Sequence, residues 1–314
     1  MDESQSATAG VSSTPPVTVA SRAAHGRSAR SKLSRSRLGE WTPNDERSDP
    51  LTILRRQATT RVPELIPIRN GRMAESPFAY FRGAAAMMAE DLAGMPNSGL
   101  EVQLCGDAHL SNFGGFASPE RSLVFDVNDF DETLPGPFEW DVKRLATSLE
   151  IAARALEFDD RTRKRITTEG VAAYRQAIRS FAEMTFLDIW NANLDINGII
   201  MSLSAELGPA AMKRFDRVVS KAVSKDRLKA KSKLTQVVDG ELRFVSDPPL
   251  LVPAESLVSA NEHSKLLNTI ESVLALYTET LPNHLQHLVG SYQMVDLARK
   301  VVGVGSVGTR CWVA

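Results

Sequence analysis

The stretch C-G-D-A-H-L-S-N at 105–112 follows a short apolar run at 100–104 that predicts a β-strand. A second strand-like run at 123–125 leads straight into the acidic segment D-V-N-D-F-D-E at 126–132. Two adjacent strands would bring the polar side chains at their ends to one place. Carboxylate and amide oxygens are the ligands that hard cations such as Mg²⁺ prefer, usually beside phosphate oxygens. The two loops therefore predict a site for metal-assisted phosphate chemistry.

The spacing within these loops assigns a role to each polar side chain. Asp107 and Asn112 stand as D-x-x-x-x-N, the arrangement of the protein-kinase catalytic loop, where Asp takes the hydroxyl proton and Asn binds metal. Asp126, at the end of the next strand, is the expected second metal ligand, and Asp129 is the alternative. His109 either contacts a phosphate of the nucleotide or orients the loop by hydrogen bonding. Together they predict transfer of the ATP γ-phosphoryl group, with Mg²⁺, to a hydroxyl of a small molecule.

The same loop resembles that of known small-molecule kinases. The string G-D-A-H-L-S-N at 106–112 is similar to the G-D-x-H-x-x-N loop of aminoglycoside phosphotransferases and of their choline- and homoserine-kinase relatives. The string E-W-D-V-K-R-L-A at 139–146 resembles the helix that supports this loop in those enzymes. The resemblance implies an α+β, mostly helical, protein-kinase-like fold. It also implies that Asp141 holds the catalytic loop by hydrogen bonds and takes no part in the chemistry.

A wider resemblance covers the chain from about residue 49 to residue 314. Here the sequence is similar to a bacterial family known only as a domain of unknown function (family 2252). The resemblance rests on four strings, at 76–83, 105–114, 125–137 and 301–312. Because the family name implies no activity, the functional prediction still depends on the kinase-like loops.

A glycine-rich segment near the end of the chain adds a third element. The string V-G-V-G-S-V-G-T at 302–309 contains G-x-G-x-x-G at Gly303, Gly305 and Gly308, between strand-like runs at 300–302 and 310–313. A strand–glycine loop–strand hairpin is the kinase form of this motif, whereas a dinucleotide-binding fold needs a helix after the glycines. We expect these glycines to cover the ATP phosphates. A plain structural hairpin explains the segment equally well.

The order of the motifs differs from that of kinases, which place the glycine loop before the catalytic loop. We therefore expect a circularly permuted kinase-like fold, with coincidence as the alternative. In a permuted fold, the strand with the phosphate-binding lysine would follow Ala314. The expectation is thus a truncated chain that ends in an incomplete nucleotide-binding lobe and is weakly active or inactive alone.

Three regions are predicted along the chain. Residues 1–45 form a Ser- and Pro-rich basic tail that we expect to be disordered, because like charges without apolar periodicity bury too little surface. Residues 46–298 form the helical catalytic lobe, and 299–314 begin the β-rich glycine-loop segment. Within the lobe, Ser76-Pro77 predicts a helix start, and an apolar stripe predicts a single helix that reaches about Leu92.

Composition excludes several classes of protein. Apolar residues make up 43% and charged residues 24%, which excludes wholesale disorder, and 37 basic against 38 acidic side chains exclude a polycation. No apolar stretch approaches the roughly 18 residues that span a bilayer, so no membrane partner is expected. The two cysteines, Cys105 and Cys311, exclude a disulfide scaffold and a four-cysteine zinc site, and they indicate a reducing cytoplasm. Cys105 is expected to be a buried thiol without a catalytic role.

Two other functions stay open. A kinase-like scaffold would bind the nucleotide without transferring phosphate. A metallophosphoesterase would use G-D-A-H at 106–109 and D-V-N-D at 126–129 as metal motifs, although five histidines are few for such a site. Nucleic acid is not the expected partner, but the basic tail and a basic run at 213–233 leave it open. Arg69, Arg72 and Arg82 either meet phosphates or form structural pairs.

Overall fold

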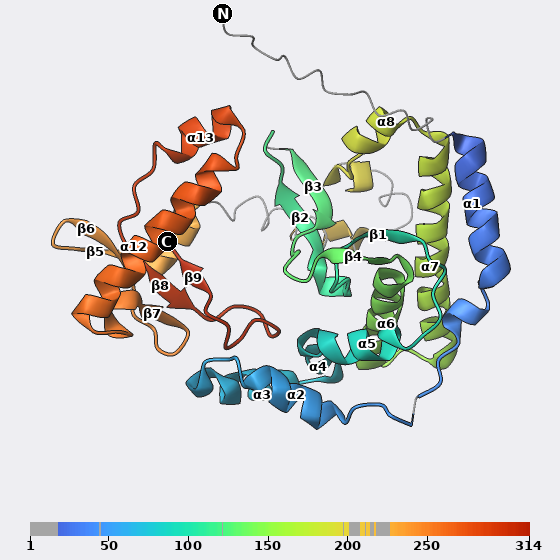
Figure 1. Ribbon diagram of the computed structural model, residues 1–314, viewed down its shortest axis with the longest axis horizontal. Helices are drawn as coiled ribbons and strands as arrows, with labels where there is room; N and C mark the ends of the chain where they lie inside the picture. Colours follow the sequence, from blue (N-terminus) through green and yellow to red (C-terminus); the bar gives the residue numbers. More distant parts are fainter. Residues whose placement is uncertain are drawn as a thin grey trace, which may run out of the picture.

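The computed structural model describes residues 18–43, 45–120, 122–196, 198–200, 208–210, 212–213, 217 and 227–314. The α+β class, mostly helical, is confirmed (Figure 1). The helices are α1 (Val19–Lys32), α2 (Pro50–Ala58), α3 (Ile66–Ala74), α4 (Pro77–Gly83), α5 (Ala85–Ala93), α6 (Glu139–Ala155), α7 (Asp160–Glu183), α8 (Phe186–Asn191), α11 (Arg227–Leu234), α12 (Ala260–Glu279) and α13 (Asn283–Val289). Short 3₁₀ turns are η1 (Arg37–Gly39), η2 (Pro63–Leu65), η3 (Leu110–Asn112) and η4 (Ala254–Ser256).

The strands form small antiparallel sheets. They are β1 (Glu101–Leu104), β2 (Phe113–Ala117), β3 (Leu123–Val127), β4 (Leu134–Pro137), β5 (Thr235–Val238), β6 (Glu241–Phe244), β7 (Leu251–Pro253), β8 (Ala298–Lys300) and β9 (Trp312–Val313). The pairs are β1 with β4, β2 with β3, and β5 with β6, and a further sheet has the order β7-β8-β9. The two predicted strands before the acidic segments, now β1 and β3, are therefore not neighbours in one sheet. β3 pairs with β2, to which a short connection joins it, whereas β1 pairs with β4, which follows β2 and β3 in the chain.

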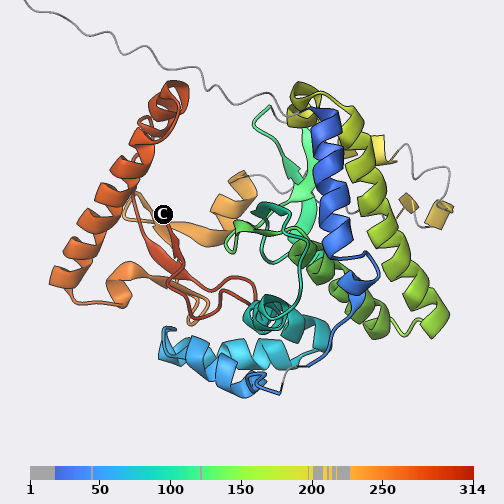
Figure 2. The same ribbon diagram turned by 45° about the vertical axis from the view of Figure 1, so that its right-hand side comes forward.

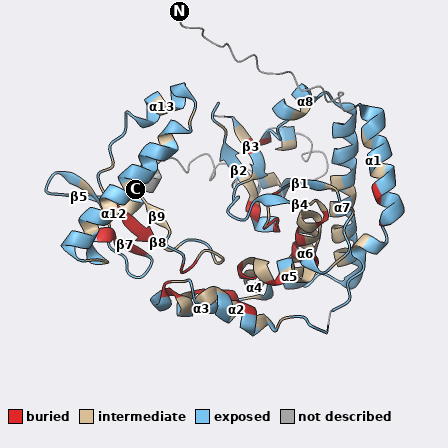
Figure 3. Ribbon diagram, in the orientation of Figure 1, coloured by how far each residue is buried: buried red, intermediate tan, exposed pale blue. Residues whose placement is uncertain are grey.

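The elements form two groups joined by a row of helices. In Figure 1, β1–β4 and α6–α8 lie on the right, β5–β9 with α12 and α13 lie on the left, and α2–α5 run below both groups. Figure 2 shows the same arrangement from another side. Buried residues gather on α2–α6 and on β7 and β8 (Figure 3). No helix in these described ranges combines the length and apolar character needed to cross a bilayer.

The N-terminal segment differs from the expected disorder. Thr18 caps α1 by accepting a hydrogen bond from the backbone N–H of Ser21 (3.1 Å), and α1 runs alongside α7 in both views (Figures 1 and 2). Ala29 and Leu33 are buried, and the Arg22 guanidinium lies 5.0 Å from the centre of the Phe186 ring. These contacts compensate for the conformational entropy that the segment loses when it becomes ordered. The charge pattern of the sequence does not reveal them. Residues 1–17 lie outside the described residues, as does most of the basic run at 213–233.

The helix predicted from Ser76-Pro77 to Leu92 is interrupted. Ser76 caps α4 as expected, with its Oγ 3.1 Å from the backbone N of Ala79. The chain then leaves helical geometry at Ala84 (φ −119°, ψ 29°) before α5 begins. Two buried arginines bond the carbonyls released at this break, since Arg69 donates to Gly83 O and Arg144 donates to Phe81 O, each at 2.7 Å. Tertiary hydrogen bonds therefore satisfy the carbonyls at this break, and the apolar periodicity of the sequence does not reveal such bonds.

The predicted C-terminal hairpin is present, with slightly different strand bounds. β8 and β9 pair with Arg299 opposite Trp312, and the connecting loop reaches α3 and α4. Val307 is fully buried against Val62 and Leu65. Val304 packs on the cluster that includes Met73 and Met87. The glycine-rich loop is thus anchored by two valines on the helices below it.

We predict that this anchoring stabilises the fold. Val307→Ala removes buried methyl groups and should lower the free energy of unfolding by about 2 kcal/mol, because the site cannot fully collapse. Val302→Ala makes the same chemical change at a side chain that is 38% exposed, and it should cost less than about 0.5 kcal/mol. Urea unfolding followed by circular dichroism measures both. Equal losses for the two variants would contradict the anchoring role.

Candidate functional site

One face of α6 holds the loop 105–112 at successive positions. The Asp141 carboxylate accepts hydrogen bonds from the backbone N–H groups of Cys105 (2.8 Å) and Gly106 (3.1 Å). Ser148 Oγ accepts a hydrogen bond from the backbone N–H of Leu110 at 3.0 Å, and it donates to Leu145 O. Asp141, Arg144 and Ser148 are spaced by three and four residues, so they share one face of the helix. Asp141 therefore makes the kind of contact that the kinase resemblance implied for it.

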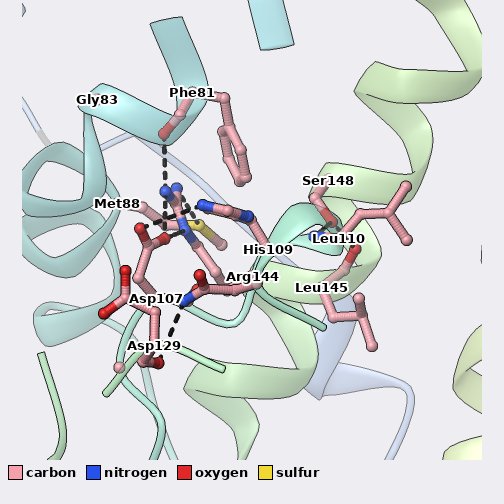
Figure 4. Close-up of polar contacts among 12 residues, drawn as sticks. Phe81, Gly83, Met88, Asp107, His109, Leu110, Asp129, Arg144, Leu145 and Ser148 are labelled. Atoms are coloured by element: carbon pink, nitrogen blue, oxygen red, sulfur yellow. Dashed lines mark hydrogen bonds and ion pairs between the residues drawn. The ribbon is translucent and has the colours of Figure 1, made fainter. Parts of the chain in front are cut away.

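Arg144, the middle residue of this face, forms a buried ion pair with Asp107 (Figure 4). Its Nε lies 2.7 Å and its Nη2 2.6 Å from Asp107 Oδ1, and both side chains are nearly excluded from solvent. Nη2 also donates to Phe81 O, and the guanidinium lies 3.7 Å from the centre of the Phe81 ring. Burial lowers the pKa of Arg144, and Asp107 opposes that shift. Arg144 thus connects the loop 105–112 to α4.

Sequence reasoning missed the role of Arg144. It identified Asp141 on the same helix but assigned no role to Arg144. The available signal was the spacing, because a residue three positions after Asp141 must face the same loop.

His109 lies on the other side of Asp107. Its Nε2 is 3.5 Å from Asp107 Oδ2, and its ring meets Phe78 edge-on with centroids 6.3 Å apart. Nδ1 is buried and has no hydrogen-bond partner among the described residues. Burial lowers the pKa of His109, Arg82 and Arg144 lower it further, and Asp107 opposes them. The imidazole is therefore held mainly in its neutral form near neutral pH.

Asn112 joins the two acidic loops. Its side-chain Nδ2 donates to the backbone oxygens of Asp107 (3.1 Å) and Asp129 (3.3 Å). Its backbone carbonyl accepts a hydrogen bond from the backbone N–H of Asn128 (3.0 Å). The two loops are thus joined by hydrogen bonds of Asn112 and not by adjacent strand ends. Within the described part of the chain, Asn112 Oδ1 accepts no hydrogen bond, so it is available as an oxygen ligand.

Asp126 and Asp129 occupy different settings. Asp126 lies inside β3 opposite Gly114, not directly after the strand as the sequence suggested, because the ladder continues to Val127. It is exposed, and its Oδ1 accepts from the backbone N–H of Val127. Asp129 follows β3 and is bonded through its backbone to Asn112. Of these two carboxylates, each predicted as the second metal ligand, Asp129 is the one that the fold attaches directly to the loop 105–112.

Negative charge gathers beside this loop. Partial burial, together with Asp107, Asp129 and Asp131, raises the pKa of Glu132. Even so, no group of three or more His, Cys, Asp or Glu side chains in the described ranges is arranged to hold a metal ion. Mg²⁺ needs few protein ligands, since it usually keeps several waters and binds phosphate oxygens as well. Asn112 Oδ1 with one carboxylate fits that requirement.

The glycine loop, residues 302–309, is bonded to the rest of the chain mainly through hydrogen bonds that its backbone carbonyls accept. Arg72 donates to Gly303 O (2.6 Å), and the backbone N–H of Val62 donates to Gly308 O (2.8 Å). Gly305 lies against the end of α4, where an added Cβ would be 3.4 Å from Arg82 O. Of the predicted phosphate-covering residues, Gly305 is therefore brought to the same helix end that Arg144 links to Asp107, whereas Gly303 and Gly308 are bonded to Arg72 and Val62.

Cys105 is partly buried, not fully buried as predicted. Burial, helped by the nearby Asp141 and Asp107 carboxylates, raises the pKa of its thiol to about 12. A thiol that stays protonated is neither a nucleophile nor a metal ligand.

The turn at Gly106 gives a direct test of the loop geometry. Gly106 has φ +88°, and an added Cβ would lie 2.0 Å from the backbone oxygen of Glu132. Gly106→Ala should therefore lower the free energy of unfolding by about 3 kcal/mol, through left-handed strain and a backbone clash together. Gly99→Ala is the matched control, because Gly99 has φ +72° with nothing within 4 Å of the added Cβ. It should cost about 1 kcal/mol from strain alone, and equal losses in urea unfolding would count against this packing.

Comparison with known proteins gives a family for the chain. No curated protein and no solved structure matches it. Residues 61–314 match the family described as "Uncharacterized protein conserved in bacteria (DUF2252)". This match confirms the wider resemblance seen in the sequence and covers most of the chain. The chain therefore belongs to the DUF2252 family of bacterial proteins.

Proposed function

We propose that this protein is an ATP- and Mg²⁺-dependent phosphotransferase that acts on a hydroxyl of a small molecule. The observation that carries the proposal is the meeting of two distant loops at the end of α4. The catalytic loop reaches this end through Arg144, which bonds both Asp107 and Phe81 O, and the glycine loop reaches it at Arg82 O. Phosphoryl transfer depends mainly on such positioning of phosphates against a proton acceptor.

Each residue then has a defined part in the proposed reaction. Asp107 Oδ1 is occupied by Arg144, so Oδ2 would accept the proton of the incoming hydroxyl. Asn112 Oδ1 and the Asp129 carboxylate would hold Mg²⁺, which would neutralise charge on the phosphates. Asp141 would keep the loop in place without contacting substrate. We favour Asp129 over Asp126 because only Asp129 is bonded to Asn112.

The proposed fold is kinase-like and circularly permuted. The glycine loop lies between the antiparallel strands β8 and β9, which is the kinase form of the motif, whereas a dinucleotide-binding loop would lead into a helix. The catalytic loop precedes it in sequence, so a permuted order follows if both loops have these roles.

A nucleotide-binding scaffold without transfer is the second candidate. Two N–H groups of Arg144 already bond Asp107 Oδ1, and this ion pair resembles a purely structural one. The scaffold interpretation predicts that Mg²⁺ and ATP bind but that the γ-phosphoryl group is never lost. Phosphorus NMR of the protein with Mg²⁺, ATP and a mixture of hydroxyl acceptors separates the two functions.

Calorimetry with ATP tests the proposal itself. The wild-type chain should bind ATP with Mg²⁺, and removing the metal should weaken binding about tenfold or more, as expected for one lost ionic contact. Asp129→Ala should weaken Mg²⁺-dependent binding by a similar factor. Asp126→Ala removes a second exposed carboxylate from the same region and should leave binding unchanged.

Two results would contradict the proposal. Failure of the folded wild-type chain to bind ATP in the presence of Mg²⁺ would exclude both the transferase and the scaffold. Binding that is indifferent to Mg²⁺ and to Asp129→Ala would remove the metal role. If Asp126→Ala alone weakens binding, the second ligand is Asp126 and the choice of Asp129 is wrong.

A further inference from the structure

Arg82, in the last turn of α4, is a cation without a partner. Its Nε is buried and makes no hydrogen bond, and no ion pair to a carboxylate is found for it among the described residues. The side chain as a whole is only half-buried, so part of it faces solvent. A buried guanidinium nitrogen without an acceptor is costly, and this cost points to an acceptor that the chain itself does not supply.

A second unpartnered polar atom lies near Arg82. His109 is 4% exposed, and its Nδ1 is buried without a hydrogen bond in the described part of the chain. Phe78, one helical turn before Arg82 on α4, meets the His109 ring edge-on, so α4 brings Arg82 close to the imidazole. The charge of Arg82 accordingly lowers the pKa of His109. The obvious internal anion, Asp107, is already paired with Arg144 and has little capacity left for Arg82.

The neighbourhood of Arg82 carries more positive charge than its own carboxylates balance. Arg61, Arg69 and Arg72 lie around the glycine loop and the end of α4, and in the described ranges none of them has a carboxylate partner. Burial, with the like charge of Arg61, lowers the pKa of Arg69 to about 10. Uncompensated guanidinium groups of this kind favour a bound anion, and phosphate is the anion that arginine binds best.

We propose that Arg82 and His109 form a binding site for a phosphate group, with Nε of Arg82 and Nδ1 of His109 as its inner donors. Phosphate at Nδ1 and Asp107 at Nε2 would place an anion on each side of the imidazole. The ring would then favour the imidazolium form, with an N–H directed at each anion. The glycine loop at Gly305 lies against the carbonyl of the same Arg82, so it borders the site.

The site is independent of any transfer reaction, since it requires only a phosphate group. That the phosphate belongs to ATP rests on the proposed function. In that case Arg82 would offset negative charge on the phosphates next to Asp107, a role separate from that of Mg²⁺.

The test is calorimetric titration of the full chain with inorganic phosphate and with tripolyphosphate, both without divalent cations. Tripolyphosphate should bind the wild-type protein, and Arg82→Gln should weaken this binding about tenfold to a hundredfold through the loss of a charged donor. Arg55→Gln is the matched control, because it removes the same charge from an exposed position on α2. It should change the affinity by less than about twofold. Arg82→Lys should be intermediate, because it keeps the charge but loses the forked donor.

A measurement on the wild-type protein tests the site without depending on whether the variants fold. Tripolyphosphate should shift the ring nitrogen resonances of His109 toward the imidazolium values at constant pH. No binding by the wild type, equal weakening by Arg82→Gln and Arg55→Gln, or an unmoved His109 signal would each overturn the site. Tripolyphosphate binding that depends on Arg82 in a protein that ignores Mg²⁺ and ATP would support the site and exclude the proposed function.

Discussion

The buried ion pair between Arg144 and Asp107 is the interaction on which the arrangement of this molecule depends. Taking two charges out of water costs several kcal/mol for each ion, and only close geometry with further hydrogen bonds repays that cost. Arg144 provides both, because it bonds Asp107, caps the carbonyl of Phe81 and lies over the Phe81 ring. The pair therefore fixes the loop 105–112 against α4 as well as against α6.

Other contacts extend from this pair. Asp141 and Ser148, on the same face of α6, hold the loop on either side of Asp107, and Asn112 connects it to Asp129. The break after α4 exposes carbonyls that Arg69 and Arg144 bind, and the glycine loop lies on that break. The irregular end of α4 is thus the point where the chain brings its distant motifs together.

Much of this arrangement could be predicted from the sequence, and the reasons for the failures are physical. The loop at 105–112 and the C-terminal hairpin follow from local spacing, and the contact of Asp141 with that loop follows from the kinase resemblance. The pairing of β1 with β4, the break at Ala84 and the helix at 19–32 depend on distant partners, and a single sequence does not show them. Arg144 was predictable only in part. Its position on the helix follows from the sequence, whereas its second partner, Phe81 O, does not.

The most direct test of the central role of this pair is a double-mutant cycle on the free energy of unfolding. Arg144→Met and Asp107→Asn each leave one buried charge uncompensated, and each should cost about 3–5 kcal/mol. The double variant removes both charges, so its cost should fall below the sum of the single costs by about 2 kcal/mol or more. Additive losses would show that the two side chains act independently, and the account of the site would then be wrong.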